Sequence, residues 1–329
     1  MTTASSEISP DLQVAPSPHI GDPALSTRRM MVDVLLALSP ALALSIWWFR
    51  WYAVAVVGLS VLSCVATEAL LTRLRGRSQS LGDGSAVVTG IILGLSMPWS
   101  APPYVVIIAA VIAISLGKMA FGGLGMNLFN PAMVGRAFVT LSFALHLGAS
   151  AYQDSSVMLD GVSQATPLIT ARMTGAGPDL SALFLGNVNG SLGETSALAL
   201  LIGGAYLCIR RVAAWEIPAG MLLGTFFTAS GTAALDLHPF GPLGHLFGGA
   251  WMLGAFYIAT DPCSSPMTRK GRWIFGAGIG ILVVILRTFS SYPEGVMFAI
   301  LIMNATAPLL NRWTIPSPLG GKLKPSPAS

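Results

Sequence analysis

The sequence predicts an all-α integral membrane protein of about ten transmembrane helices, arranged as an inverted repeat of two five-helix units. Three observations lead to this prediction. Only 10% of the 329 residues are charged and 53% are hydrophobic, whereas soluble domains carry about 25% charged residues. The mean hydropathy is +0.70, and the sequence contains many apolar runs near the roughly 20 residues that a helix needs to cross the hydrocarbon. The third observation is an internal repeat, described below.

The expected spans lie between two polar tails. Residues 1–28 are rich in Ser and Pro and lack a basic n-region and an apolar h-region, so we expect a flexible cytoplasmic tail and no cleaved signal peptide. The first repeat is expected at 29–147, with spans at 30–48, 51–72, 83–97, 103–119 and 129–147. A long polar loop at 148–195 is expected to be external. The second repeat is expected at 196–312, with spans at 196–213, 217–235, 243–260, 273–289 and 294–311. Residues 313–329 form the second tail.

The distribution of Lys and Arg indicates the orientation of these spans. With the amino terminus inside, 14 of the 18 Lys and Arg residues fall on the inner side. The other four are Arg50, Arg172 and Arg287 outside and Arg136 within the fifth span. Because cytoplasmic loops carry the excess of basic residues, we expect both termini in the cytoplasm and Thr195 at the outer face.

An internal repeat relates the third and eighth spans. The stretch Gly90–Pro102 aligns with Gly254–Pro266, with Gly, Ser and two Pro residues in register. The two stretches close spans that are five helices apart, so they run in opposite directions through the membrane. Inverted repeats of this kind place binding sites near the repeat axis, at helices that Pro or Gly interrupts.

Paired glycines inside the apolar runs predict close helix packing. Their Gly-x-x-x-Gly spacing lets two helix backbones approach each other. The pairs are Gly90/Gly94, Gly220/Gly224, Gly244/Gly248 and Gly276/Gly280.

Composition and spacing argue against several other classes of function. The three Cys and four His residues are scattered, so the sequence predicts no metal or iron–sulfur site in this chain. The net charge of +4 comes without a basic patch interleaved with aromatic residues, so we expect no nucleic-acid partner. No catalytic triad, phosphate-binding loop or dinucleotide fingerprint is present, and we assign no catalytic residue.

The stretch Gly190–Ser196 leads directly into the sixth span. Glycines loosen the approach, and Glu194, Thr195 and Ser196 stand at the start of the helix. A helix start leaves backbone N–H groups unpaired and carries a partial positive charge, which suits a bound phosphate. The same residues are also ordinary helix caps. The motif alone does not separate these interpretations.

Several ionisable residues lie near the ends of spans. Asp83 opens the third span and Asp261 closes the eighth, and each is either a helix cap or part of a site. Glu68 is expected to pair with Arg73 or Arg75, one turn away, or to reach the interface.

The fifth span carries Arg136 close to its expected start. If Asn130 caps this helix and Pro131 begins it, Arg136 lies about 9 Å along the axis. Its side chain then either reaches the inner surface or faces a polar cavity, where it meets an anionic ligand or a break in the backbone.

Three stretches together resemble one family. Asn127–Phe138, Gly193–Ala199 and Thr260–Thr268 are similar to the RnfD/NqrB family of membrane subunits, found in the Rnf electron-transport complex and in the sodium-pumping NADH:quinone reductase. The resemblance covers nearly all of residues 30–312 and includes the family's inverted repeat of ten helices. The compact length is more similar to the RnfD branch.

The resemblance implies a flavin carrier. In the family, the threonine of the Gly-Glu-Thr-Ser stretch is esterified through the phosphate of FMN, and here that residue is Thr195. By the logic of the repeat, Asp83, residues 96–100 and the stretch Thr260–Ser265, which contains Asp261, are assigned to the same site as Glu194 and Ser196. Some members also hold a second, non-covalent riboflavin, which we assign to the region of Asn127 and Asn130, next to Arg136.

The resemblance also implies a setting for the chain. It would be a multi-pass subunit of the bacterial inner membrane that passes electrons between ferredoxin-linked and NAD-linked partners, coupled to ion transport. Its partners would include a second flavin subunit and iron–sulfur subunits, and the chain would be inactive alone. The alternative is an inverted-repeat channel or transporter for a small solute, with the Gly190–Ser196 stretch acting only as a cap.

Overall fold

The regular structure of the chain is helical. The computed structural model describes residues 26–76, 81–147, 180–186, 190–235, 237, 241–290 and 295–316. Within these ranges every named element is a helix, and the isolated bridge between Pro98 and Ser191 joins two loops. The sequence-based prediction of an all-α membrane protein is confirmed. The predicted tails and most of the 148–195 loop lie outside the described residues.

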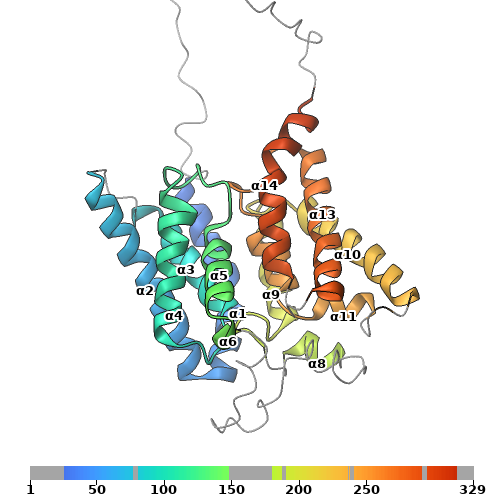
Figure 1. Cartoon of the computed structure of the whole chain (residues 1–329), viewed down its shortest axis with the longest axis horizontal. Coiled ribbons are helices and arrows are strands. Elements are labelled where there is room, and N and C mark those ends of the chain that lie inside the picture. The colour runs from blue at the N-terminus through green and yellow to red at the C-terminus, as the bar shows by residue number, and fades with distance from the viewer. Residues whose placement is uncertain are drawn as a thin grey trace, which may run out of the picture.

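The elements of the first half occupy one side of the molecule in Figure 1, and those of the second half the other. The first half comprises α1 (Thr27–Phe49), α2 (Trp51–Leu74), η2 (Leu81–Asp83), α3 (Ser85–Ser96), α4 (Pro103–Ile112), η3 (Ala113–Met119), α5 (Pro131–Ser142) and α6 (Ala144–Leu147). The second half comprises α8 (Leu180–Leu185), α9 (Ala197–Ile209), α10 (Glu216–Ala234), α11 (Pro242–Phe247), α12 (Trp251–Leu253), η5 (Gly254–Ile258), α13 (Arg269–Phe289) and α14 (Val296–Thr314). The halves meet where α1 packs on α9 and α5 packs on α14.

Helices occupy all ten predicted spans, but their lengths differ. Among the described residues, α1, α2, α13 and α14 are long and apolar enough to cross a membrane by themselves. By contrast, α3 has 12 residues and α9 has 13, so each is about 20 Å long, against roughly 30 Å of hydrocarbon. Pro98 follows the end of α3, and the helical conformation is disfavoured for the residue before a proline. The short helices leave irregular backbone inside the bundle, where side chains can build a site.

Two of the predicted spans are broken. The fifth was expected to run through 129–147, but it starts at Pro131 and is interrupted at Phe143. The eighth was expected to run through 243–260, but it divides into α11, α12 and the π-helix η5. Gly249 causes part of this break because its φ of +66° is incompatible with a right-handed helix.

Glycines bring α10 and α13 into close contact, as their spacing predicts. A Cβ atom on Gly224 would lie 2.3 Å from the carbonyl oxygen of Ala277, and one on Gly276 would lie 2.3 Å from that of Ile217. On the other side of the molecule, a Cβ on Gly90 would lie 2.6 Å from Cα of Val61 on α2. Only glycine allows these backbone approaches.

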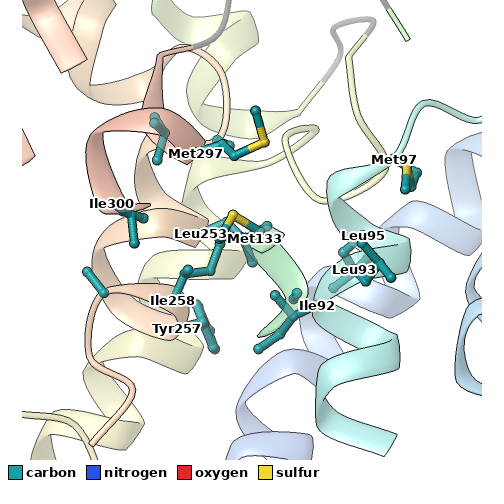
Figure 2. Close-up of a cluster of buried hydrophobic side chains, with 14 of the residues drawn as sticks. Ile92, Leu93, Leu95, Met97, Met133, Leu253, Tyr257, Ile258, Met297 and Ile300 are labelled. Carbon is teal, nitrogen blue, oxygen red and sulfur yellow. The ribbon is translucent and has the colours of Figure 1, made fainter. Parts of the chain in front are cut away.

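The core joins the two halves. Figure 2 shows Ile92 and Leu95 of α3 facing Met133 of α5, with Tyr257 of η5 and Ile300 of α14 on the far side of Met133. These residues belong to one buried apolar cluster. The arrangement of the two halves as an inverted repeat stays a prediction.

Candidate functional site

The stretch before α9 forms a tight turn. The backbone N–H of Glu194 donates to the carbonyl of Ser191 at 2.9 Å, and the Ser191 hydroxyl donates to the Glu194 carboxylate at 2.6 Å. A Cβ on Gly190 would lie 3.3 Å from that carboxylate. Glu194 therefore closes the turn, and its carboxylate lies close to Gly190.

This turn packs on the carboxyl end of α3. The N–H groups of Leu192 and Gly193 donate to the carbonyls of Met97 at 3.0 Å and Leu95 at 2.6 Å. A Cβ on Gly193 would lie 3.0 Å from Cβ of Leu95, so the approach is tight and favours glycine. The Ser45 hydroxyl of α1 also donates to the Leu192 carbonyl. The turn is thus fixed between the two halves of the molecule.

Thr195 lies immediately before the first residues of α9. Its side chain is 2% exposed, and its hydroxyl donates to the Leu192 carbonyl over 3.5 Å, which is a weak hydrogen bond. Ser196 caps α9 because its hydroxyl accepts the Ala199 N–H at 3.3 Å. The earlier amides of the first turn have no acceptor within the helix. A hydroxyl without a strong partner therefore stands at the positive end of a helix.

Arg136 contacts Met97, whose carbonyl accepts the Leu192 N–H of this turn. Asn130 caps α5, accepting the Met133 N–H at 3.3 Å, and Pro131 begins the helix, as predicted. Arg136 is 7% exposed, so it does not extend to the surface. Within the described part of the chain, its hydrogen-bond acceptor is the Met97 sulfur, at 3.2 Å. A thioether is a weak acceptor, and a buried cation without an anion is costly.

A second group of predicted residues lines a cavity beside the amino half of α3. Asn127, Asn130, Thr260 and Asp261 share this cavity of about 90 Å³. Asp261 accepts the Cys263 N–H and the Ser264 hydroxyl, both at 3.1 Å. Burial raises the pKa of the Asp261 carboxyl, although these donors lower it. The cavity therefore presents amide, hydroxyl and carboxyl groups.

Asn304 is hydrogen-bonded to Asn130 of this group, and sequence reasoning missed it. Its side-chain oxygen accepts the Asn130 N–H at 3.2 Å, and its amide donates to the Ser264 carbonyl at 3.0 Å. Asn304 is fully buried and joins α14 to the start of α5 and to the loop after η5. The available signal was a carboxamide within the apolar run of the tenth span, where polar residues are unusual.

The structure separates residues that repeat logic had assigned to one site. The turn of Thr195 contacts Leu95–Pro98 at the carboxyl end of α3, whereas Thr260 and Asp261 line the cavity beside its amino half. Asp83 accepts the Ser85 N–H at 2.8 Å. Gly84 occupies the N-cap position of α3, so Asp83 binds the first residue of the helix from one position further out, and its part in a site stays a prediction.

Glu68 has a different partner from the expected one. Lys118 donates to both carboxylate oxygens of Glu68, at 2.8 and 2.7 Å, and to the Ser85 hydroxyl at 2.6 Å. Both charged side chains are almost fully buried. The expected pairing of Glu68 with Arg73 or Arg75 is wrong, because the fold brings Lys118 of η3 against α2.

The two groups of residues suit flavins differently. The weakly bonded Thr195 hydroxyl and the first-turn amides of α9 fit a phosphoester and its negative charge, and the Arg136 guanidinium contacts Met97 in the segment on which the Thr195 turn packs. The cavity that Asn127 and Asn130 line has suitable polar groups, but about 90 Å³ is well below the roughly 300 Å³ or more of ligand pockets. We therefore derive no step from a non-covalent riboflavin.

Comparison with known proteins shows to which family this chain belongs. Residues 13–320 match the family described as NQR2, RnfD, RnfE. The D subunit of the Na⁺-translocating ferredoxin:NAD⁺ oxidoreductase complex of Acetobacterium woodii is 42% identical, over 92% of this chain and 94% of that protein. The D subunit of the proton-translocating complex of Clostridium ljungdahlii is 36% identical, over 93% and 96%. The D subunit of an ion-translocating oxidoreductase complex of Halorhodospira halophila is 37% identical, over 94% and 95%.

The fold and the candidate site thus define a helical membrane protein with short, interrupted helices around a central core. The chain belongs to the NQR2, RnfD and RnfE family, as the three sequence stretches indicated.

Proposed function

We propose that this chain is the flavin-carrying membrane subunit of an ion-translocating Rnf-type complex, with FMN bound through its phosphate to Thr195. The observation that carries the proposal is the setting of the Thr195 hydroxyl. It stands at the amino end of α9 with a weak 3.5 Å hydrogen bond, so esterification of this hydroxyl would remove only one weak hydrogen bond. The relatives named as D subunits of ion-translocating complexes support the placement of the chain in such a complex.

The residues around Thr195 would have separate roles in this proposal. Glu194 and Ser191 hold the turn, and Ser196 caps α9. The helix start and the buried Arg136 would offset the charge of the phosphate, since Arg136 has only the Met97 sulfur as its described acceptor. When bound, the flavin supplies the electron-transfer chemistry, and the chain fixes its position and charge.

The complex would supply the remaining steps. We propose that the chain sits in the bacterial inner membrane with other Rnf-type subunits, including a second flavin subunit and iron–sulfur subunits, and that it is inactive alone. Two relatives of similar identity are named for different ions, sodium and protons. The proposal therefore leaves the coupled ion unspecified.

In-gel flavin fluorescence of the denatured protein tests the proposal. The chain is produced in a host that attaches FMN to membrane proteins, and the gel removes flavin that is not covalently bound. We expect a fluorescent band for the wild type, no band for Thr195→Ala, and a retained band for Ser196→Ala, which keeps the hydroxyl of Thr195. Peptide mass spectrometry would place the modification.

A dark wild-type band from such a host, with a control flavoprotein labelled, would contradict the proposal. The inverted-repeat transporter would then become the leading function, with the cavity near Asn130 as its candidate solute site. Reductase activity in the purified single chain would contradict the proposed dependence on partner subunits.

A further inference from the structure

The hydroxyl that would carry FMN is covered by the chain itself. Thr195 is 2% exposed, and every residue of the stretch Gly190–Ser196 is buried. A phosphoester forms only when the phosphorus atom of a donor comes into contact with the acceptor oxygen. Neither a flavin donor nor the enzyme that carries it reaches the Thr195 oxygen in this arrangement.

The short helix α8 and the glycine after it form the cover over Thr195. α8 lies beside α9 and α11 (Figure 1), and the Phe184 carbonyl accepts the Ser196 hydroxyl at 3.4 Å. Gly186 has a φ of +108°, and a Cβ there would lie 2.5 Å from the Thr195 carbonyl oxygen. Glycine adopts this φ readily and allows so close an approach. The backbone at the end of α8 therefore packs directly on Thr195.

The two sides of Thr195 are held with unequal strength. Three hydrogen bonds hold its turn against α3 and α1, two of them at 3.0 and 2.6 Å. On the α8 side, the 3.4 Å bond to Phe184 is weak. The other described contacts there are the buried Leu183 and the rings of Phe184 and Phe247, with centroids 5.4 Å apart. A helix of six residues is not stable without such packing. The α8 side is therefore the one that opens more easily.

We propose that α8 and Gly186 control the attachment of FMN, which takes place only in an open form in which α8 has left Thr195 and the turn stays on α3. This inference rests on the proposed function. In the open form, the Thr195 oxygen attacks the phosphorus next to the riboflavin of a flavin dinucleotide. The phosphoanhydride bond breaks, and the nucleoside monophosphate leaves with the bonding electron pair. The hydroxyl proton passes to a base of the transferring enzyme or to water, and the flavin keeps its oxidation state.

A first measurement follows the opening without any flavin. In the full-length chain with its three native cysteines replaced, the rate at which Thr195→Cys reacts with a small maleimide reports the open population. Leu183→Ala should raise this rate at least about tenfold, because it removes buried contacts that hold α8 in place. Leu185→Ala lies on the same helix at a residue that is 63% exposed, so it is the matched control and should leave the rate unchanged. The unfolding temperature of each variant checks that the rest of the bundle stays folded.

A second measurement locks the cover in a chain that keeps Thr195. Phe184→Cys and Phe247→Cys are joined by a short bifunctional thiosulfonate, which a reductant removes. The chain is produced without flavin and incubated with a flavin transferase and a flavin dinucleotide, and in-gel fluorescence measures the attached flavin. We expect at least about tenfold slower attachment in the linked protein than after reduction, because the linker removes the open population. Phe184→Cys alone, treated in the same way, should gain flavin as fast as the reduced double variant.

Two results would overturn the inference. One is a Thr195→Cys that reacts as fast as Arg50→Cys, an exposed position, and is insensitive to Leu183→Ala. The other is equal attachment of flavin to the linked and the reduced protein. Failure of the proposed function is distinguishable from both. No flavin would then attach even to the reduced protein, while the maleimide rates would still depend on Leu183, which would support the cover and reject the covalent flavin.

Discussion

Glu68 and Lys118 form an ion pair inside the bundle that was not expected from the sequence. Lys118 donates to both oxygens of the Glu68 carboxylate and to Ser85. Because the pair is almost fully buried, loss of Lys118 removes two charge-assisted hydrogen bonds from Glu68, and loss of the Glu68 charge removes them from Lys118. The sequence could not indicate this pair, since Arg73 and Arg75 are closer in sequence and the partner lies 50 residues away.

We predict that Glu68→Gln and Lys118→Met each lower the free energy of unfolding by about 3–5 kcal/mol, whereas the double change Glu68→Leu with Lys118→Met is close to neutral. Unfolding in a denaturing detergent would measure this. Arg269→Gln is the control, because Arg269 is 88% exposed in its pair with Glu216 and exposed ion pairs contribute about 1 kcal/mol or less. Single changes as mild as Arg269→Gln would contradict the prediction.

Arg287 holds the break between α11 and α12. Its guanidinium donates to the carbonyls of His245 at 2.7 Å and Gly248 at 2.8 Å, at a point where α11 ends and its next turn no longer supplies backbone donors. The sequence placed Arg287 among the outer charges, but it is 2% exposed. Charge counting gives orientation, and it does not show whether a basic residue faces water or a buried carbonyl.

We predict that Arg287→Met costs about 3 kcal/mol or more in the free energy of unfolding, because it removes the guanidinium donors from two buried carbonyls. Arg287→Lys should recover only part of this loss, since an ammonium lacks the planar fork that reaches both carbonyls. Thermal unfolding of both variants in the same detergent measures the difference. Equal stability of Arg287→Lys and the wild type would show that charge alone matters here.

At the scale of elements, the spacing of the glycines predicted which helices pack together. The length of the apolar runs was a poorer guide to where each helix begins and ends. Gly224 and Gly276 lie where α10 and α13 touch, as their spacing indicated. The eighth span looked continuous in the sequence, yet it breaks at Gly249, and the broken ends depend on Arg287 from another helix. A distant side chain of this kind leaves no signal in the local sequence pattern.

Two glycines of α10 offer a matched test of this packing. A Cβ at Gly224 would lie 2.3 Å from the Ala277 carbonyl, whereas one at Gly231 would meet nothing within 4 Å. We predict that Gly224→Ala lowers the free energy of unfolding by about 1–3 kcal/mol. Gly231→Ala should instead be neutral or stabilising by up to about 1 kcal/mol. A Gly224→Ala variant as stable as Gly231→Ala would show that the two helices can separate without cost.

At the scale of the whole molecule, the sequence predicted the class of fold and the family, but not how the site residues are grouped. Asn127, Thr260 and Asp261 share one cavity, while Thr195 packs against the opposite end of α3. The repeat logic related Thr260 to Ser96 by sequence position and therefore assigned both to one site. Which side chains meet depends on where α3 ends and how α14 positions Asn304, and neither follows from a local motif.

Orientation in the membrane is the remaining property of the whole molecule that the sequence predicts. The basic residues favour an inner position for the ends of the chain and an outer position for the turn between α1 and α2. In a chain whose native Cys64, Cys208 and Cys263 are replaced, we predict that Arg50→Cys reacts with a membrane-impermeant maleimide in intact spheroplasts. Arg73→Cys and Lys270→Cys, all three being exposed positions, should react only after the membrane is opened. Labelling in the reverse order would invert the topology. It would also move the Thr195 turn, which packs on the same end of α3 as Pro98, to the cytoplasmic side, where a covalent flavin would meet a different set of partner subunits.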